Sequence, residues 1–181
     1  MKNSCMLLND ELSFFQNLLL DILTRQVVFR RFENEMKKTN LTQHNDLMSL
    51  SWYGYIISQL SDCRKFFDRD GNAHSFQFVV KHLKDESLKE KHGKLFEEWK
   101  NKKLETVLNK YMLHADMRVS EINTEVSMKT LDEFIDVLEK YLKDIVDDLS
   151  KNYSDIGSLN YAAYLSEREN EVDIFFAEVR K

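Results

Sequence analysis

The feature that most limits the fold of this chain is its shortage of residues that interrupt helices. The 181 residues include no proline and only four glycines. Both residue types mark the frequent turns of all-β folds, and proline also breaks helices. The composition is 43% hydrophobic and 31% charged, which suits a protein with a buried core and a charged surface. We therefore predict an all-α fold: an antiparallel bundle of four to five long helices with short extra helices.

Length, charge and cysteine content narrow the class of protein further. A chain of this size fits a single domain, which we assign to residues 1–181. The formal net charge of −5 offers no general positive field for nucleic acids, so any contact with RNA must be local. Cys5 and Cys63 form no CxxC pair, and Asp21 interrupts the most apolar run, residues 18–23. We expect a cytoplasmic protein that does not contact a membrane.

Helical periodicity is clear in the first half of the sequence. Apolar residues recur at a spacing of three to four over residues 11–38 and again over residues 47–67. The polar stretch 40–46 between them offers turn and capping residues. Residues 75–87 read as a short helix capped by Ser75. This half therefore predicts two long helices followed by a short one.

The next helix is predicted from a capping pattern. Ser87 is followed three residues later by Glu90, the spacing of a capping box. The helix that follows is expected to run through Trp99 and Leu104 toward His114 and to end within residues 117–127.

The last third contains the clearest amphipathic pattern. A helix is predicted to open at Ser127 or Thr130 and to end near Gly157, which suits a C-terminal stop. Residues 155–181 have a weaker apolar stripe, and they form either a docked C-terminal helix or an arm that packs on a second subunit. The residues expected on the buried face of the amphipathic helix are Leu131, Phe134, Ile135, Leu138, Tyr141, Leu142, Ile145, Val146 and Leu149.

The sequence motifs of several metal-binding and phosphate-binding sites do not occur in this chain. The Glu-x-x-His spacing of di-iron bundles, HExxH, zinc-type Cys/His spacings and glycine-rich phosphate loops do not occur. We predict no metal site and no cofactor. His44, His74, His82 and His92 belong to no motif, and we expect them to be solvated.

One histidine has a more informative setting. In NKYMLHADMR, residues 109–118, Lys110 and Arg118 each stand four positions from His114. Residues four apart on a helix lie on the same side, so a helical segment places a cation one turn away on either side of the imidazole. This arrangement is either a solvated helix face or an anion site.

The same segment predicts a second contact surface. Leu113 and Met117 point away from the stripe expected to face the core, next to His114. A two-fold contact through them would bring His114 from two copies together. We therefore expect a homodimer. The predicted core stripe consists of Leu104, Val107, Leu108, Tyr111, Ala115 and Val119.

A cationic cleft of this kind has the groups needed for metal-independent RNA cleavage. Histidine can take the proton of the 2′-hydroxyl, and a lysine or arginine can stabilise the negative charge that develops on phosphorus. The alternative is structural, with His114 capping or packing at a helix end and Asp116 paired with a neighbour.

Three stretches together resemble the HEPN superfamily, and most closely its branch linked to bacterial abortive infection. They are LSWYGYIISQLSDCRKFF with its aspartate, DRDGNAHSFQFVVKHLKD, and NKYMLHAD followed by a long amphipathic helix. The likeness covers residues 10–150, and NKYMLHAD is its one motif. It implies a helical bundle, usually homodimeric, found in ribonucleases of toxin-antitoxin, phage-defence and CRISPR systems.

The resemblance also implies roles for single residues. The family motif is an arginine, a polar residue, a few further positions and a histidine, and here Asn109 and His114 match the last two. Leu108 occupies the arginine position, so Lys110 or Arg118 would have to bind the phosphate. We expect either a divergent ribonuclease, with His114 and Asn109 as catalytic residues, or a non-catalytic dimer that binds RNA, a nucleotide or a partner protein such as an antitoxin.

Overall fold

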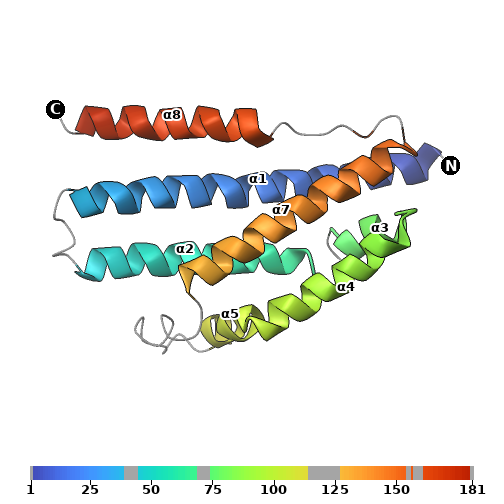
Figure 1. Cartoon of the computed structure of the whole chain (residues 1–181), viewed down its shortest axis with the longest axis horizontal. Coiled ribbons are helices and arrows are strands. Elements are labelled where there is room, and N and C mark those ends of the chain that lie inside the picture. Colours follow the sequence, from blue (N-terminus) through green and yellow to red (C-terminus); the bar gives the residue numbers. More distant parts are fainter. Residues whose placement is uncertain are drawn as a thin grey trace.

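The computed structural model describes residues 2–38, 45–68, 74–113, 127–153, 156 and 161–179. These ranges contain helices and no strand, which confirms the predicted all-α class. In Figure 1, α1 and α2 run side by side in opposite directions, α7 crosses them obliquely, and α8 lies along the other side of α1. The helices are α1 (Lys2–Lys38), α2 (Asn45–Lys65), α3 (Phe76–Lys81), α4 (Glu86–Asn101), α5 (Leu104–Leu113), α7 (Met128–Ser150) and α8 (Tyr161–Val179).

The amphipathic helix α7 supplies much of the core, as its sequence predicts. Its start is fixed by Ser127, whose Oγ accepts a hydrogen bond of 3.1 Å from the backbone N–H of Thr130. All nine residues of the predicted apolar face are buried. They contact buried side chains of α1, α2 and α4, so one continuous core joins these helices.

The start of α4 differs from the predicted capping box. The capping residue is Asp85, whose Oδ1 accepts a hydrogen bond of 2.8 Å from the backbone N–H of Ser87. The Ser87 hydroxyl also donates to this oxygen, so Ser87 lies inside the helix and does not cap it. These hydrogen bonds lower the pKa of Asp85. A carboxylate at this end also suits the positive end of the helix dipole, which explains why Asp85 takes the position.

The helix predicted through Trp99 to His114 is interrupted. Lys103 has a positive φ of 59°, and it separates α4 from α5. Trp99 and Leu104 are both buried. Residues five apart on an unbroken helix lie about 140° apart, so one straight helix could not turn both side chains fully into the core. The left-handed residue at 103 resolves this conflict by changing the helix direction.

Other boundaries shift by smaller amounts. The first helix begins at Lys2 and not near residue 11. The short helix α3 follows Ser75, but the Ser75 side chain makes no capping hydrogen bond, and its backbone N–H donates to Glu11 Oε2 at 3.1 Å. Helix α7 ends at Ser150, before the predicted stop at Gly157, which lies outside the described residues.

Helix α8 packs along α1. Leu165 of α8 contacts the core, and Arg31 of α1 approaches Asp173 of α8, with 3.4 Å between Nη2 and Oδ2. None of the described helices is long and apolar enough to cross a lipid bilayer.

Candidate functional site

Helix α5 carries the first part of the motif segment at the surface of the bundle. Leu104, Val107 and Leu108 are fully buried, which confirms this part of the predicted core stripe. The next two residues, Asn109 and Lys110, are half-buried. Leu108 therefore fills a core position, and the polar residues of the motif segment begin at Asn109.

An arginine from another helix lies beside Asn109. Arg64, in the last turn of α2, donates a hydrogen bond from Nη1 to Asn109 Oδ1 at 3.3 Å. Its side chain is exposed. Arg64 and Asn109 thus lie side by side, although they are 45 positions apart in the sequence.

The geometry of α2 explains why Arg64 faces α5. Asp62 and Arg64 are two residues apart, so they project about 200° apart around the helix. Asp62 faces α1, where it pairs with Arg25, and Arg64 therefore faces the other neighbour, α5.

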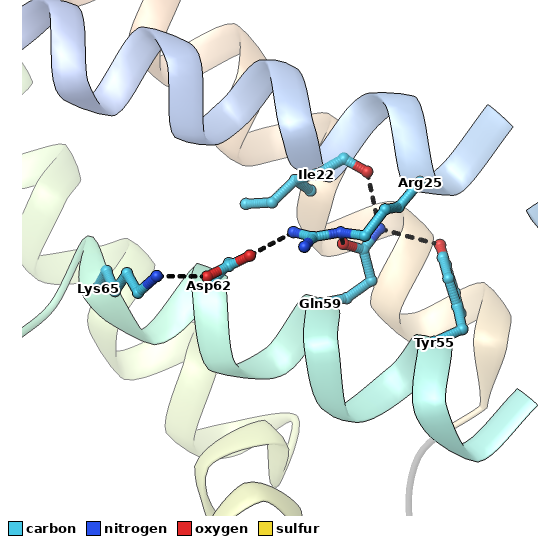
Figure 2. A network of polar contacts seen from close by, with 6 residues as sticks. All are labelled: Ile22, Arg25, Tyr55, Gln59, Asp62 and Lys65. Atoms are coloured by element: carbon cyan, nitrogen blue, oxygen red, sulfur yellow. Dashed lines mark hydrogen bonds and ion pairs between the residues drawn. The ribbon is translucent and has the colours of Figure 1, made fainter. Parts of the chain in front are cut away.

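A polar network holds α2 against α1 on the side of Asp62. Figure 2 shows Arg25 of α1 between Asp62 and Gln59 of α2, with Lys65 on the other side of Asp62. Gln59 is fully buried, and its amide donates to the backbone oxygen of Ile22 at 2.8 Å. Its oxygen accepts from Arg25 Nε at 3.1 Å. These contacts fix the rotation of α2 about its axis and hence the direction of Arg64.

Asp62 is the aspartate of the stretch that resembles the HEPN superfamily. Burial by itself would raise its pKa, but hydrogen bonds from Lys65 and Arg25 outweigh this effect and lower the pKa below the ordinary value. Asp62 is therefore ionised in the folded protein and serves as an anchor for Arg25.

The lowered pKa predicts a loss of stability in acid. The unfolded chain takes up a proton on Asp62 near pH 3.9, before the folded protein does, so the stabilisation is present above about pH 4 and is lost below it. Asp62→Asn should reduce the free energy of unfolding by about 1–3 kcal/mol at pH 7. Its unfolding free energy, measured with urea, should also fall less steeply than that of the wild type between pH 4 and pH 3.

Asp144→Asn is the matched control, because Asp144 pairs with Lys91 on the exposed surface at 2.6 Å. An exposed ion pair contributes little to stability, so we expect Asp144→Asn to lower the free energy of unfolding by no more than about 1 kcal/mol. Equal losses in the two variants, or an Asp62→Asn effect that does not depend on pH, would contradict the anchoring role.

The remaining predicted site residues lie beyond the end of α5. His114 and Arg118 follow Leu113, the last residue of the helix, and they lie outside the described residues. The predicted interface through the side chains of Leu113 and Met117 also lies outside the part that the structure describes. The structure therefore brings Arg64 beside Asn109, Lys110 is the next residue on α5, and the histidine follows in the chain.

The described part of this site has the properties of an oxyanion-binding surface. A guanidinium group carries five N–H donors, and the bond to Asn109 uses one of them. Orientation by Asn109 reduces the conformational freedom that Arg64 would lose on binding a phosphate. Lys110 adds a second positive charge on the adjacent position. The arrangement can bind a phosphodiester and stabilise additional negative charge on it.

One prediction about the other histidines is wrong. His92 is buried, with 5% of its surface exposed, and its Nε2 lies 2.8 Å from Gln77 Nε2. It stacks on the ring of Tyr141. The signal was available in α4, since Leu88, His92, Leu95 and Trp99 repeat at helical spacing on one face. No group of three or more metal-ligating side chains occurs among the described residues.

Comparison with known proteins finds no relative of this chain. No family model matches the chain, and no curated protein or solved structure is similar to it.

Proposed function

We propose that this protein is a divergent HEPN-like endoribonuclease that cleaves RNA without a metal ion. The observation that carries the proposal is the hydrogen bond between Arg64 and Asn109. It supplies the arginine and the polar residue of the motif from two helices, while His114 follows α5 in the chain.

Each residue has a role in the proposed reaction. His114 removes the proton of a ribose 2′-hydroxyl, and the 2′ oxygen attacks the adjacent phosphorus. Arg64 and Lys110 stabilise the negative charge of the phosphorane, and Asn109 orients Arg64. The bond from phosphorus to the 5′ oxygen breaks, and this oxygen takes up a proton. The products are a 2′,3′-cyclic phosphate and a 5′-hydroxyl. Arg118 binds the flanking phosphate.

The proposal includes a biological setting taken from the resemblance. The protein acts in a bacterial phage-defence or toxin-antitoxin type system, as a cytoplasmic homodimer controlled by a cognate partner. An active ribonuclease of this kind is expected to arrest growth when it is expressed without that partner.

A binding function without catalysis is the second candidate. It is favoured by Leu108, which fills the family's arginine position and is fully buried. Under this alternative, Arg64, Asn109 and Lys110 bind RNA, a nucleotide or an acidic partner, and no bond is cut.

The test is RNA cleavage in the presence of EDTA. Wild-type protein is incubated with a mixed RNA pool, and the new ends are analysed for 2′,3′-cyclic phosphate. His114→Ala should reduce cleavage by about 10²- to 10⁴-fold, because general acid–base catalysis contributes on this order. His74→Ala is the control. His74 is a half-exposed histidine that stands two residues before α3, and its loss should leave the cleavage rate unchanged. Binding of the RNA pool without cleavage would favour the second candidate.

A further inference from the structure

A groove of about 690 Å³ runs along α1 between α2 and α8, and neither Arg64 nor Asn109 lines it. We call it the α1–α2–α8 groove. Its floor on α1 extends from Thr24 to Phe32, a length of about 12 Å or two helical turns. Figure 1 shows α2 and α8 on opposite sides of α1, and these two helices form the walls. The apolar residues of the lining include Val28, Phe29, Phe32, Val172, Phe175 and Phe176.

Apolar side chains of the groove are open to solvent. Phe175 of α8 is 58% exposed and Val28 of α1 is 40% exposed, and both line the groove. Single exposed apolar residues are ordinary, but these two lie on one concave surface, and apolar groups gathered in this way mark a binding surface. The groove is therefore suited to a partner that covers apolar side chains.

The wall formed by α2 is uncharged and low. No acidic or basic residue occurs over residues 51–61, about three turns of this helix, whereas a surface helix normally has charged residues on the side that faces water. Ser51, Gly54 and Ser58 line this wall. Apart from the adjoining backbone of α2, nothing in the described structure lies within 4 Å of the place that a Cβ atom on Gly54 would take. Small side chains allow another helix to approach closely.

The backbone of the surrounding helices decides what kind of chain fits the groove. The N–H and C=O groups of α1, α2 and α8 form hydrogen bonds within each helix. An extended peptide would therefore find no backbone partners along the groove. A helix satisfies its own backbone, and it covers an apolar groove with side chains three or four positions apart. Two turns of an amphipathic helix match the length of the floor.

The edge of the groove along α8 is acidic. Glu171 lines the groove, and Glu167 and Glu178 stand four and seven positions from it, which places them on the same side of α8. Glu171 pairs with Arg168. Glu167 and Glu178 are exposed, and the described residues provide no ion pair for either of them. This edge therefore keeps two carboxylates whose charge is not balanced.

These charges distinguish between the possible occupants. A second copy of the chain would offer its own α8, on which Ile174 and Phe175 are exposed. Helix α8 has five carboxylates and one arginine, a net charge of −4, so the α8 of one copy would be repelled by the edge of the other. A helix with lysine or arginine beside its apolar face would be attracted instead.

We propose that the α1–α2–α8 groove binds an amphipathic helix of a partner protein, a helix that is apolar on one face and basic beside it. Its apolar residues enter the groove, and its lysine or arginine residues face Glu167 and Glu178. This site is independent of the RNA chemistry proposed for Arg64 and Asn109, so either one can fail without the other.

Binding is tested with a fluorescently labelled synthetic helix of leucine and lysine, in which the leucines lie on one face. Fluorescence anisotropy with the full-length protein should show saturable binding of one peptide per chain. A matched peptide with glutamate in place of lysine should bind at least about tenfold more weakly. Replacing Glu167 and Glu178 together by glutamine should weaken binding of the lysine peptide about two- to tenfold, and this difference should shrink in high salt.

A pair of glycine substitutions locates the site. Gly54 and Gly93 are both exposed inside helices and have open space for a side chain, but Gly93 is on α4 and does not line the groove. Arginine favours a helix more than glycine does, so Gly54→Arg and Gly93→Arg should both remain folded, which circular dichroism checks. Both variants add the same charge. Gly54→Arg should weaken binding of the lysine peptide at least about tenfold, and Gly93→Arg should leave it unchanged.

Three results would overturn the proposal. The first is a lysine peptide that shows no saturable binding, or that binds Gly54→Arg and Gly93→Arg equally. The second is binding of the glutamate peptide as tight as that of the lysine peptide. The third is a wild-type dimer that Gly54→Arg converts to a monomer in light scattering, since a second copy of the chain would then occupy the groove.

Discussion

Arg64→Ala is expected to reduce RNA cleavage by about 10²- to 10³-fold, the usual cost of removing one donor that stabilises developing negative charge. The fold should not change, because the Arg64 side chain is exposed at the end of α2 and, within the described part of the chain, its hydrogen-bond partner is Asn109 alone. Initial cleavage rates of the mixed RNA pool in EDTA measure the loss of activity, and urea unfolding curves measure whether the stability of the fold is retained.

Two further variants test whether the activity depends on the guanidinium group at position 64 or only on positive charge at the surface. Arg64→Lys keeps the charge but loses the planar donor fork, so it should recover only part of the activity. Arg31→Ala removes an exposed arginine that faces Asp173 on α8, and it should cleave as the wild type does. If Arg64→Ala and Arg31→Ala had the same rate as wild type, Arg64 would have no part in the reaction.

Leu108→Arg is expected to unfold the protein, although it places an arginine at the position where the HEPN motif has one. Leu108 is fully buried in the core beside α2 and α4. Burying an unpaired guanidinium there should lower the free energy of unfolding by more than about 4 kcal/mol, a large part of the total stability of a small domain. Urea unfolding and circular dichroism measure the loss.

Leu108→Met is the control for this position, since it conserves volume and should cost less than about 1.5 kcal/mol. A folded Leu108→Arg variant that cleaves RNA faster than wild type would show that the motif arginine belongs on α5 and not on α2.

The overall class of the fold is predictable from this sequence because its signals are local. The lack of proline allows long uninterrupted helices, because no residue lacks the backbone N–H that a helix needs. The apolar stripe of α7 repeats over six turns, and Ser127 stands directly before it with a side chain able to cap. Patterns confined to one helix do not depend on how the helices pack, so they survive in the folded structure.

Boundaries that depend on packing are not predictable in the same way. The interruption at Lys103 arises because Trp99 and Leu104 both need a place in the core, and only their partners in other helices impose that need. Glycine is the residue normally expected at a positive φ, so a lysine with this backbone conformation gives no sign of it in the sequence. At α4 two capping residues compete, and Asp85 prevails through two hydrogen bonds to Ser87.

The candidate site was only partly predictable for a related reason. Asn109 and Lys110 are identified from the motif segment and lie at the surface of α5. Arg64 carries no such signal, because its role depends on the rotation of α2, which the contacts of Arg25 with Gln59 and Asp62 determine. A pattern within one segment cannot reveal a neighbour supplied by another helix.

The measurement that tests the account most directly is a double-mutant cycle on RNA cleavage in EDTA. Single-turnover rates are compared for wild type, Arg64→Ala, His114→Ala and the double variant. If the two residues act on one phosphodiester, the double variant should be no slower than the slower single variant, because residues of one catalytic unit are strongly non-additive. Reductions that multiply, or single variants as fast as wild type, would contradict a shared catalytic centre.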